Sequence, residues 1–135
     1  MPGSFFDTNV VIYIASGDTA KANKAETLLS EGGTISVQVL NEIANVARRT
    51  MRLSWEETNA FLTLIRGLLI VQPVTVQIHQ SGLEIAARYR LSVYDAMIVA
   101  SSLQAACDTL WSEDMQHGMV LDGRLRIVNP FRAQV

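Results

Sequence analysis

The chain has 135 residues, of which 49% are hydrophobic and 18% are charged, and these values exclude a disordered or fibrous protein. Its length suits a single domain with a substantial core. The formal net charge of −2 does not indicate a general nucleic-acid binder. However, nine of the eleven cations are Arg, which suits bidentate phosphate contacts better than Lys, so charge does not exclude such a partner.

Cysteine content and hydropathy indicate the cellular compartment in which the protein is expected. The single Cys107 allows no internal disulfide, and its small apolar neighbours favour a place in the core over a nucleophilic role. No stretch reaches the roughly 18 apolar residues that span a bilayer. The N-terminus lacks the basic region and apolar run that are typical of a signal peptide. We therefore expect a cytoplasmic protein without a membrane partner.

Short apolar runs alternate along the chain with segments of helical periodicity. Strands are expected at residues 5–6, 34–36, 68–71, 109–111 and 125–128. Helices are expected over residues 10–15, 19–31, 39–52, 76–88 and 94–106. One further helix is expected to start at Ser54, where Glu57 completes a capping box.

Strands separated by helices of about ten residues predict a parallel sheet with helices on both faces. We expect one α/β domain over residues 1–135, a three-layer sandwich with a central, mainly parallel sheet of four to five strands flanked by helices. Ligands of such sheets bind outside the carboxyl ends of the strands. Asp7 and Asp114 follow two of the predicted strands at this edge.

Four acidic residues lie where an apolar run ends or a helix begins, and each also has a local explanation. Asp7 could cap the helix that starts near Asn9. Asp95 follows Ser92 at the spacing of a capping box, and Asp114 could hold a turn. None of these three is diagnostic by itself.

The fourth acid, Glu42, is harder to explain locally. It lies between Val39 and Val46 at helical spacing, so it borders the buried stripe of its helix. A solvated Glu would more naturally fall on the side of Asn41 and Asn45, although the side chain could still reach solvent at the rim of the stripe. Glu42 therefore favours a functional role more than the other three acids do.

Taken together, the four acids indicate a divalent metal site. Magnesium and manganese favour oxygen ligands and keep several bound waters. His79, His117 and Cys107 are too scattered for a zinc site. The hydroxyls of Thr8 and Ser112 could orient a ligand carboxylate or a metal-bound water, or simply hold turns.

Four segments of the chain, in order and spacing, resemble the motifs of PIN-domain proteins. They are residues 5–10 (FFDTNV), 36–42 (SVQVLNE), 94–100 (YDAMIVA) and 110–118 (LWSEDMQHG). At this length, the chain is most similar to the VapC toxins of toxin–antitoxin pairs.

This resemblance implies a Mg²⁺-dependent endoribonuclease, with Mn²⁺ as a substitute, that cleaves structured RNA such as transfer or ribosomal RNA and so blocks translation. It also implies a homodimer that is inhibited by a cognate VapB-type antitoxin. Asp7, Glu42, Asp95 and Asp114 would be the catalytic acids, with Asp7, Asp95 and Asp114 as metal ligands. Asn9 and Ser112 would be supporting polar residues, and Thr8 would accompany them. Glu113 competes with Asp114 for the last place, and we favour Asp114 because family members most often keep Asp there.

Arg48, Arg49 and Arg52, expected on the same helix as Glu42, are candidates for contacts with RNA phosphates or with a partner protein. Two other functions stay open. A haloacid-dehalogenase-like phosphohydrolase would use Asp7 as nucleophile, but it needs a second Asp where this chain has Asn9. A non-catalytic PIN-like scaffold would bind RNA or protein without cutting it.

Overall fold

The computed structural model describes residues 3–132 and contains a six-stranded sheet in the order β3-β2-β1-β4-β6-β5. All neighbouring strands are parallel except β5 and β6. The strands are β1 (Ser4–Phe6), β2 (Thr34–Ser36), β3 (Ile70–Gln72), β4 (Thr109–Trp111), β5 (Val120–Leu121) and β6 (Leu125–Val128). The helices are α1 (Thr8–Val11) with the 3-10 turn η1 (Ile12–Ala15), α2 (Thr19–Ser30), α3 (Val37–Arg49), α4 (Trp55–Leu68), α5 (Val76–Tyr89) and α6 (Val93–Gln104).

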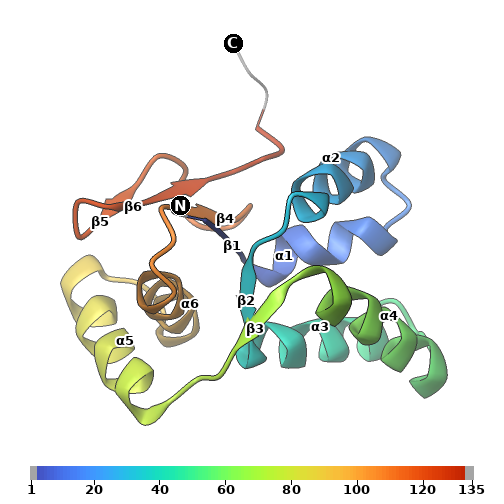
Figure 1. The fold of residues 1–135 in the computed structure, drawn as a ribbon, viewed down its shortest axis with the longest axis horizontal. Helices are drawn as coiled ribbons and strands as arrows, with labels where there is room; N and C mark the ends of the chain where they lie inside the picture. Colours follow the sequence, from blue (N-terminus) through green and yellow to red (C-terminus); the bar gives the residue numbers. More distant parts are fainter. Residues whose placement is uncertain (1–2, 133–135) are drawn as a thin grey trace.

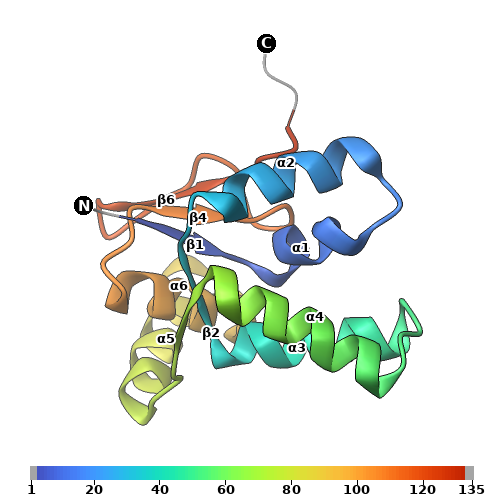
Figure 2. The same cartoon turned by 45° about the vertical axis from the view of Figure 1, so that its right-hand side comes forward.

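The helices form two layers around the sheet. Helices α1 and α2 lie on one face, and α5 and α6 pack together on the other (Figures 1 and 2). Helices α3 and α4 pack against each other beside the β2–β3 end of the sheet. Within residues 3–132, no helix has the length and apolarity needed to cross a membrane.

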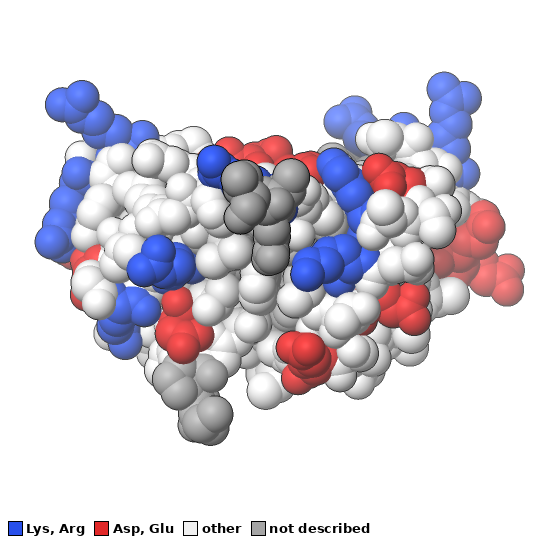
Figure 3. All heavy atoms as spheres, turned by 90° about the horizontal axis from the view of Figure 1, so that it is seen from above, with Lys and Arg blue, Asp and Glu red and all other residues white. Residues whose placement is uncertain are grey.

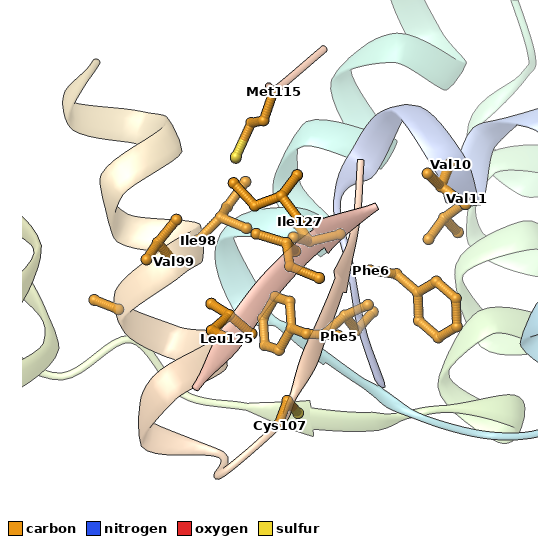
Figure 4. Close-up of a cluster of buried hydrophobic side chains, with 14 of the residues drawn as sticks. Phe5, Phe6, Val10, Val11, Ile98, Val99, Cys107, Met115, Leu125 and Ile127 are labelled. Carbon is orange, nitrogen blue, oxygen red and sulfur yellow. The ribbon is translucent and has the colours of Figure 1, made fainter. Parts of the chain in front are cut away.

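The central strand β1 is buried on both faces because it carries two consecutive phenylalanines. Phe5 and Phe6 are both fully buried, and they point to opposite sides of the sheet (Figure 4). Phe6 points toward Val10 and Val11 of α1, whereas Phe5 lies among the side chains beside β6, near Leu125. This double burial is typical of a parallel strand covered by helices, and it fixes the position of the residue that follows, Asp7.

Gly33 allows β2 to approach β1 closely. A Cβ atom at this position would lie 2.6 Å from Phe6 Cε2 and 2.8 Å from the carbonyl oxygen of Ser4, and the φ angle is +152°. Both distances are shorter than a van der Waals contact, and the backbone atom of Ser4 cannot rotate away. The glycine is therefore needed for packing.

The strand order reverses direction at β1, because β2 and β3 lie on one side of it and β4 on the other. Such a switch point leaves a crevice outside the carboxyl ends of the neighbouring strands, where ligands of open α/β sheets bind. Asp7 follows β1 and Ser112 follows β4 at this point. The topology thus brings together two motifs that are 105 residues apart.

The structure confirms the α/β class, the mainly parallel sheet between helices, the Ser54–Glu57 capping box and the buried position of Cys107. The sheet has one strand more than the expected four to five, because the two-residue strand β5 is too short to leave a sequence pattern. The helix expected to reach Arg52 ends at Arg49. Arg52 lies in the following loop with φ 56°, so the prediction that the three Arg share one helix was wrong.

Candidate active site

A groove of about 740 Å³ opens at the switch point, and all four predicted acids line it. The residues contributed by the end of β1 and α1 are Asp7, Thr8, Asn9 and Ile12; those of α3 are Gln38, Asn41, Glu42, Asn45 and Val46; Tyr94 and Asp95 come from α6, and Asp114 follows β4. Acids that are far apart in the sequence therefore share one concave surface.

Asp7 is held in place by several hydrogen bonds. It is the N-cap of α1, and its Oδ1 accepts from the backbone N–H of Thr8 at 2.7 Å. Its Oδ2 accepts from Ser112 Oγ at 2.8 Å and from Asn9 Nδ2 at 3.3 Å. The helix-cap explanation of Asp7 is therefore correct, but it accounts for only one of the two carboxylate oxygens.

Burial raises the pKa of Asp7 from 3.8 to about 6. The hydrogen bonds from Ser112 and Thr8 act in the opposite direction, while the charges of Asp95 and Glu42 raise the pKa further. The side chain is only 5% exposed. A cation bound in the groove would offset both the desolvation and the repulsion, which is the environment expected of a metal ligand.

Asn9 and Ser112 connect the ends of β1 and β4. Asn9 Oδ1 accepts from the backbone N–H of Glu113 at 3.0 Å, while its amide nitrogen donates to Asp7. Ser112 Oγ accepts from the backbone N–H of Met115 at 3.2 Å and donates to Asp7. Both predicted supporting residues thus orient Asp7 and the chain segment that carries Asp114.

Glu42 is half-buried on α3 and faces the groove at the border of the buried stripe of its helix. Its Oε1 accepts a hydrogen bond from Thr8 Oγ1 at 2.8 Å. This contact joins α3 to the residue next to Asp7, so the carboxylate is oriented by a neighbour of the metal-ligand candidate and does not point freely into solvent.

Asp95 and Asp114 are less constrained than Asp7. Ser92 caps α6 by accepting from the backbone N–H of Asp95 at 3.2 Å, which places Asp95 in the first turn. Within residues 3–132, no hydrogen bond or salt bridge involves the carboxylate of Asp95 or of Asp114. Neither carboxylate is therefore held in place by a hydrogen bond from the described residues.

Glu113, the neighbour of Asp114, is directed elsewhere. Its carboxylate accepts from Lys21 Nζ at 2.6 Å and from the Tyr13 hydroxyl at 2.8 Å. Partial burial alone would raise the pKa of Glu113, but these two hydrogen bonds outweigh it and lower the pKa. The ammonium of Lys21 also lies over the rings of Tyr13 and Phe131. Asp114, which lines the groove, is thus the acid available to a ligand there.

The donor set fits a hydrated, oxygen-preferring cation and does not fit a closed metal cage. Within residues 3–132, no three Asp, Glu, His or Cys side chains are close enough together to hold a metal ion as they stand. Magnesium is usually bound through one or two carboxylates with several waters. Asp7 would hold such an ion, with Asp95 and Asp114 reaching it through water or by rotating inward.

The three Arg candidates lie outside the groove. Arg48 donates from Nη1 to the carbonyl of Leu53 at 2.7 Å and stacks over the Trp55 ring, 4.2 Å from its centre. It therefore has a structural role in the loop after α3. Arg49 and Arg52 are exposed.

Six groove residues were not predicted from the sequence: the apolar Ile12 and Val46, and four that can form hydrogen bonds, Gln38, Asn41, Asn45 and Tyr94. The three amides Gln38, Asn41 and Asn45 share a face of α3 with Glu42, and this helical spacing was a usable signal. The signal for Tyr94 was its position next to Asp95. The two asparagines were assigned to a solvated face, which is correct for their exposure but overlooks that this face borders the groove.

Comparison with known proteins identifies related folds. A protein-family model described as PIN domain matches residues 4–118. No curated protein matches the sequence significantly. Among solved structures, a toxin–antitoxin complex from Klebsiella pneumoniae superposes with a TM-score of 0.74 at 18% identity, covering 96% of this chain and 99% of that chain.

Two further structures share the fold. A DNA-bound VapBC complex from Salmonella typhimurium gives a TM-score of 0.70 at 20% identity and covers 94% of this chain and 97% of that chain. VapC20 of Mycobacterium tuberculosis, a toxin that cleaves the sarcin–ricin loop, gives a TM-score of 0.67 at 20% identity and covers 82% of this chain and 89% of that chain. At these identities the likeness establishes a common architecture.

Proposed function

This chain belongs to the PIN domain family, and on that premise we propose that it is a metal-dependent endoribonuclease toxin of a toxin–antitoxin pair. The reaction would be hydrolysis of a phosphodiester in structured RNA, in which water attacks phosphorus and the bond to the leaving oxygen breaks. The single domain would span residues 1–135. Cleavage of transfer or ribosomal RNA would block translation.

One observation carries this proposal. The acids of four separate motifs line one groove at the switch point of the sheet, and the most buried of them, Asp7, has its pKa raised by burial and by its acidic neighbours. Such an arrangement is costly in the free protein. It becomes favourable when a divalent cation, Mg²⁺ or Mn²⁺, occupies the groove.

The residues would divide the work as follows. A bound divalent cation would supply the positive charge that stabilises the phosphodiester oxygens as negative charge develops on them. Asp7 and Asp95 would hold it directly, and Asp114 would do so directly or through water. Glu42, oriented by Thr8, would accept a hydrogen bond from the attacking water and help to remove its proton. Asn9 and Ser112 would keep Asp7 in position.

The proposed partners follow from the same assignment. The toxin would act in the cytoplasm as a homodimer and would be held inactive by a cognate VapB-type antitoxin protein. Structural relatives that are described as toxin–antitoxin complexes support this partner class. Arg49 and Arg52, which are exposed, stay candidates for contacts with RNA or with the partner protein.

The test is cleavage of total RNA, transfer RNA and ribosomal RNA by the purified chain with Mg²⁺, Mn²⁺ or EDTA. Asp7→Asn and Asp95→Asn should each lower the rate by on the order of 100-fold, because a metal ligand supports several kcal/mol of charge stabilisation. Glu31→Gln, an exposed acid at the end of α2, is the matched control. Cleavage that persists in both Asn variants would sink the assignment.

In the described residues, no three acidic side chains are close together. This observation favours one alternative function, a non-catalytic scaffold that binds RNA or protein through the same groove. Calorimetry separates the two. Saturable Mn²⁺ binding that is lost in Asp7→Asn supports the nuclease, whereas the absence of such binding favours the scaffold.

A further inference from the structure

Tyr94 presents a free aromatic ring at the groove. It lies in the first turn of α6, immediately before Asp95, and 70% of its surface is exposed. The ring lines the groove together with the acids. Exposure alone does not indicate a function, because single exposed aromatic residues are common. The position of this ring beside the candidate metal ligands does indicate one.

The side chains of the other two tyrosines, Tyr13 and Tyr89, form hydrogen bonds or packing contacts within the protein. Tyr13 donates to Glu113, and its ring packs against Lys21. Tyr89 donates to Asp122 and accepts from the backbone N–H of that residue. Within residues 3–132, the hydroxyl of Tyr94 has no hydrogen-bond partner, and its ring contacts no aromatic ring or cation. Tyr94 is thus the tyrosine whose side chain forms none of these contacts in the described part of the chain.

The α3 wall of the groove carries amide side chains. Gln38, Asn41 and Asn45 share one helical face, and each amide offers both donors and an acceptor. Gln38 donates to the backbone carbonyl of Tyr94 at 3.2 Å, which joins the two walls. In the described residues, the amides of Asn41 and Asn45 form no hydrogen bond within the protein and are exposed. They are free to pair with a ligand.

The groove lacks the cations that would bind a phosphate backbone. None of its lining residues is Lys or Arg. Basic and acidic side chains are interspersed on the face seen in Figure 3, without one continuous basic area. Within the groove, protein side chains therefore offer no ion pair to a phosphate, and their contacts with RNA there have to be made with the bases and sugars.

We propose that Tyr94 and the amides of α3 form a nucleobase subsite, in which one unpaired base stacks on the Tyr94 ring and turns its edge toward Asn41 or Asn45. This inference rests on the proposed ribonuclease function and specifies the substrate as RNA with an unpaired nucleotide at the cleavage site. Aromatic stacking with hydrogen bonds to base edges is how proteins read single-stranded RNA. A base inside a duplex cannot offer its face to the ring.

The test measures binding of a single-stranded RNA heptamer that contains one 2-aminopurine, with Ca²⁺ in place of Mg²⁺ and with the integrity of the RNA checked on a gel. Tyr94→Leu should weaken binding by roughly 5- to 150-fold, which is the effect of about 1–3 kcal/mol for a base–aromatic stack at 1.4 kcal/mol per tenfold change. The quenching of 2-aminopurine that stacking causes should also be lost. Tyr94→Phe should keep both signals, and Tyr94→Gln serves as a second variant without the ring.

Two controls isolate the ring. Trp55→Leu removes an aromatic residue of similar exposure, 65%, that lies outside the groove, and it should bind as the wild type does. Annealing the heptamer to its complement should abolish the difference between wild type and Tyr94→Leu. Equal binding and quenching of the single strand by wild type and Tyr94→Leu would overturn the inference, as would an equal loss with the duplex, which indicates a backbone or protein contact.

Cleavage of RNA by the wild type in Mg²⁺ is measured separately. If the wild type cleaves RNA and Tyr94→Leu binds normally, only the subsite is wrong. If binding depends on Tyr94 but no cleavage occurs, the subsite stands and the nuclease assignment fails.

Discussion

Asp7 and the pair Asp95 and Asp114 line the same groove but are held in opposite ways. Asp7 is buried, and its carboxylate accepts hydrogen bonds from Thr8, Asn9 and Ser112. The other two carboxylates accept none from the described residues, and Asp114 is exposed. In the proposed metal site, this difference would allow a cation to bind although no three acidic side chains of the described residues are close together. One ligand would be fixed in advance, and two would adjust when the ion binds.

The largest expected effect separates Asp114 from its neighbour. Asp114→Asn should lower metal-dependent RNA cleavage by about 30-fold or more, because it removes a carboxylate that borders the groove. Glu113→Gln should lower it less than about threefold, because Glu113 pairs with Lys21 outside the groove. Initial cleavage rates of the two variants provide the comparison. A larger loss in Glu113→Gln would mean that the acids have exchanged roles.

The second-largest effect is expected for Ser112, whose hydroxyl donates a hydrogen bond to Asp7. Ser112→Ala removes the hydrogen bond that lowers the pKa of Asp7, so more of the carboxyl group is protonated near neutral pH and the ion has to displace a proton. Mn²⁺ affinity should fall by about tenfold. Calorimetry of Ser112→Ala is compared with Ser81→Ala, an exposed serine on α5. Unchanged affinity would show that Asp7 does not need this support.

The pH dependence of the metal-free protein gives a smaller effect. The folded pKa of Asp7, about 6, lies above its ordinary value of 3.8. The folded state therefore holds the proton more tightly, and the stability contributed by this group is present below about pH 4 and is lost as pH rises through 6.

Asp7→Asn removes this charge but also disturbs the hydrogen bonds to Oδ2. Without metal it should raise the free energy of unfolding by about 1 kcal/mol at pH 7, and lower it by about 1 kcal/mol at pH 4, where the charge term is nearly absent and the hydrogen-bond loss remains. Urea denaturation at the two pH values measures the difference. Strong destabilisation at pH 7 would show that the helix cap, and not charge repulsion, dominates at this position.

The smallest effect is expected for the ion pair between Lys21 and Glu113, which holds the segment that carries Asp114. Lys21→Met removes the ion pair with Glu113 but keeps an apolar side chain against Tyr13 and Phe131. Because surface ion pairs contribute little, Tm should fall by about 1–3 °C. A thermal scan, with Lys24→Met as control, checks this. A decrease in Tm of about 10 °C would show that the ion pair between Lys21 and Glu113 contributes much more to stability than a surface ion pair does.

Local patterns predicted most of the fold. The alternation of apolar runs and helical periods predicted the mainly parallel sheet, and the spacing of Ser54 and Glu57 predicted the start of a helix; the structure confirms both. Strand β5 was missed because two residues carry no period, and it exists only through its pairing with β6. Arg52 was placed on α3 because nothing local marks the positive φ angle with which it leaves the helix.

The candidate site was predictable where a residue type is unusual for its local position. Glu42 beside a buried stripe and Asp7 after a buried strand are such cases. The orientation of Glu113 was not predictable, because it depends on Lys21, which is 92 residues away. The role of Arg48 in the loop after α3 was not predictable either, because it depends on how that loop folds back on the helix to bring Leu53 and Trp55 to the guanidinium.

We propose that one fixed and two adjustable carboxylates form a divalent metal site. Calorimetric titration of Mn²⁺ at pH 7 into wild type, Asp7→Asn, Asp95→Asn and the control Glu31→Gln tests it most directly. We predict saturable binding in wild type and in Glu31→Gln, weaker binding in Asp95→Asn and none in Asp7→Asn. Binding of equal strength in all four proteins would contradict the account.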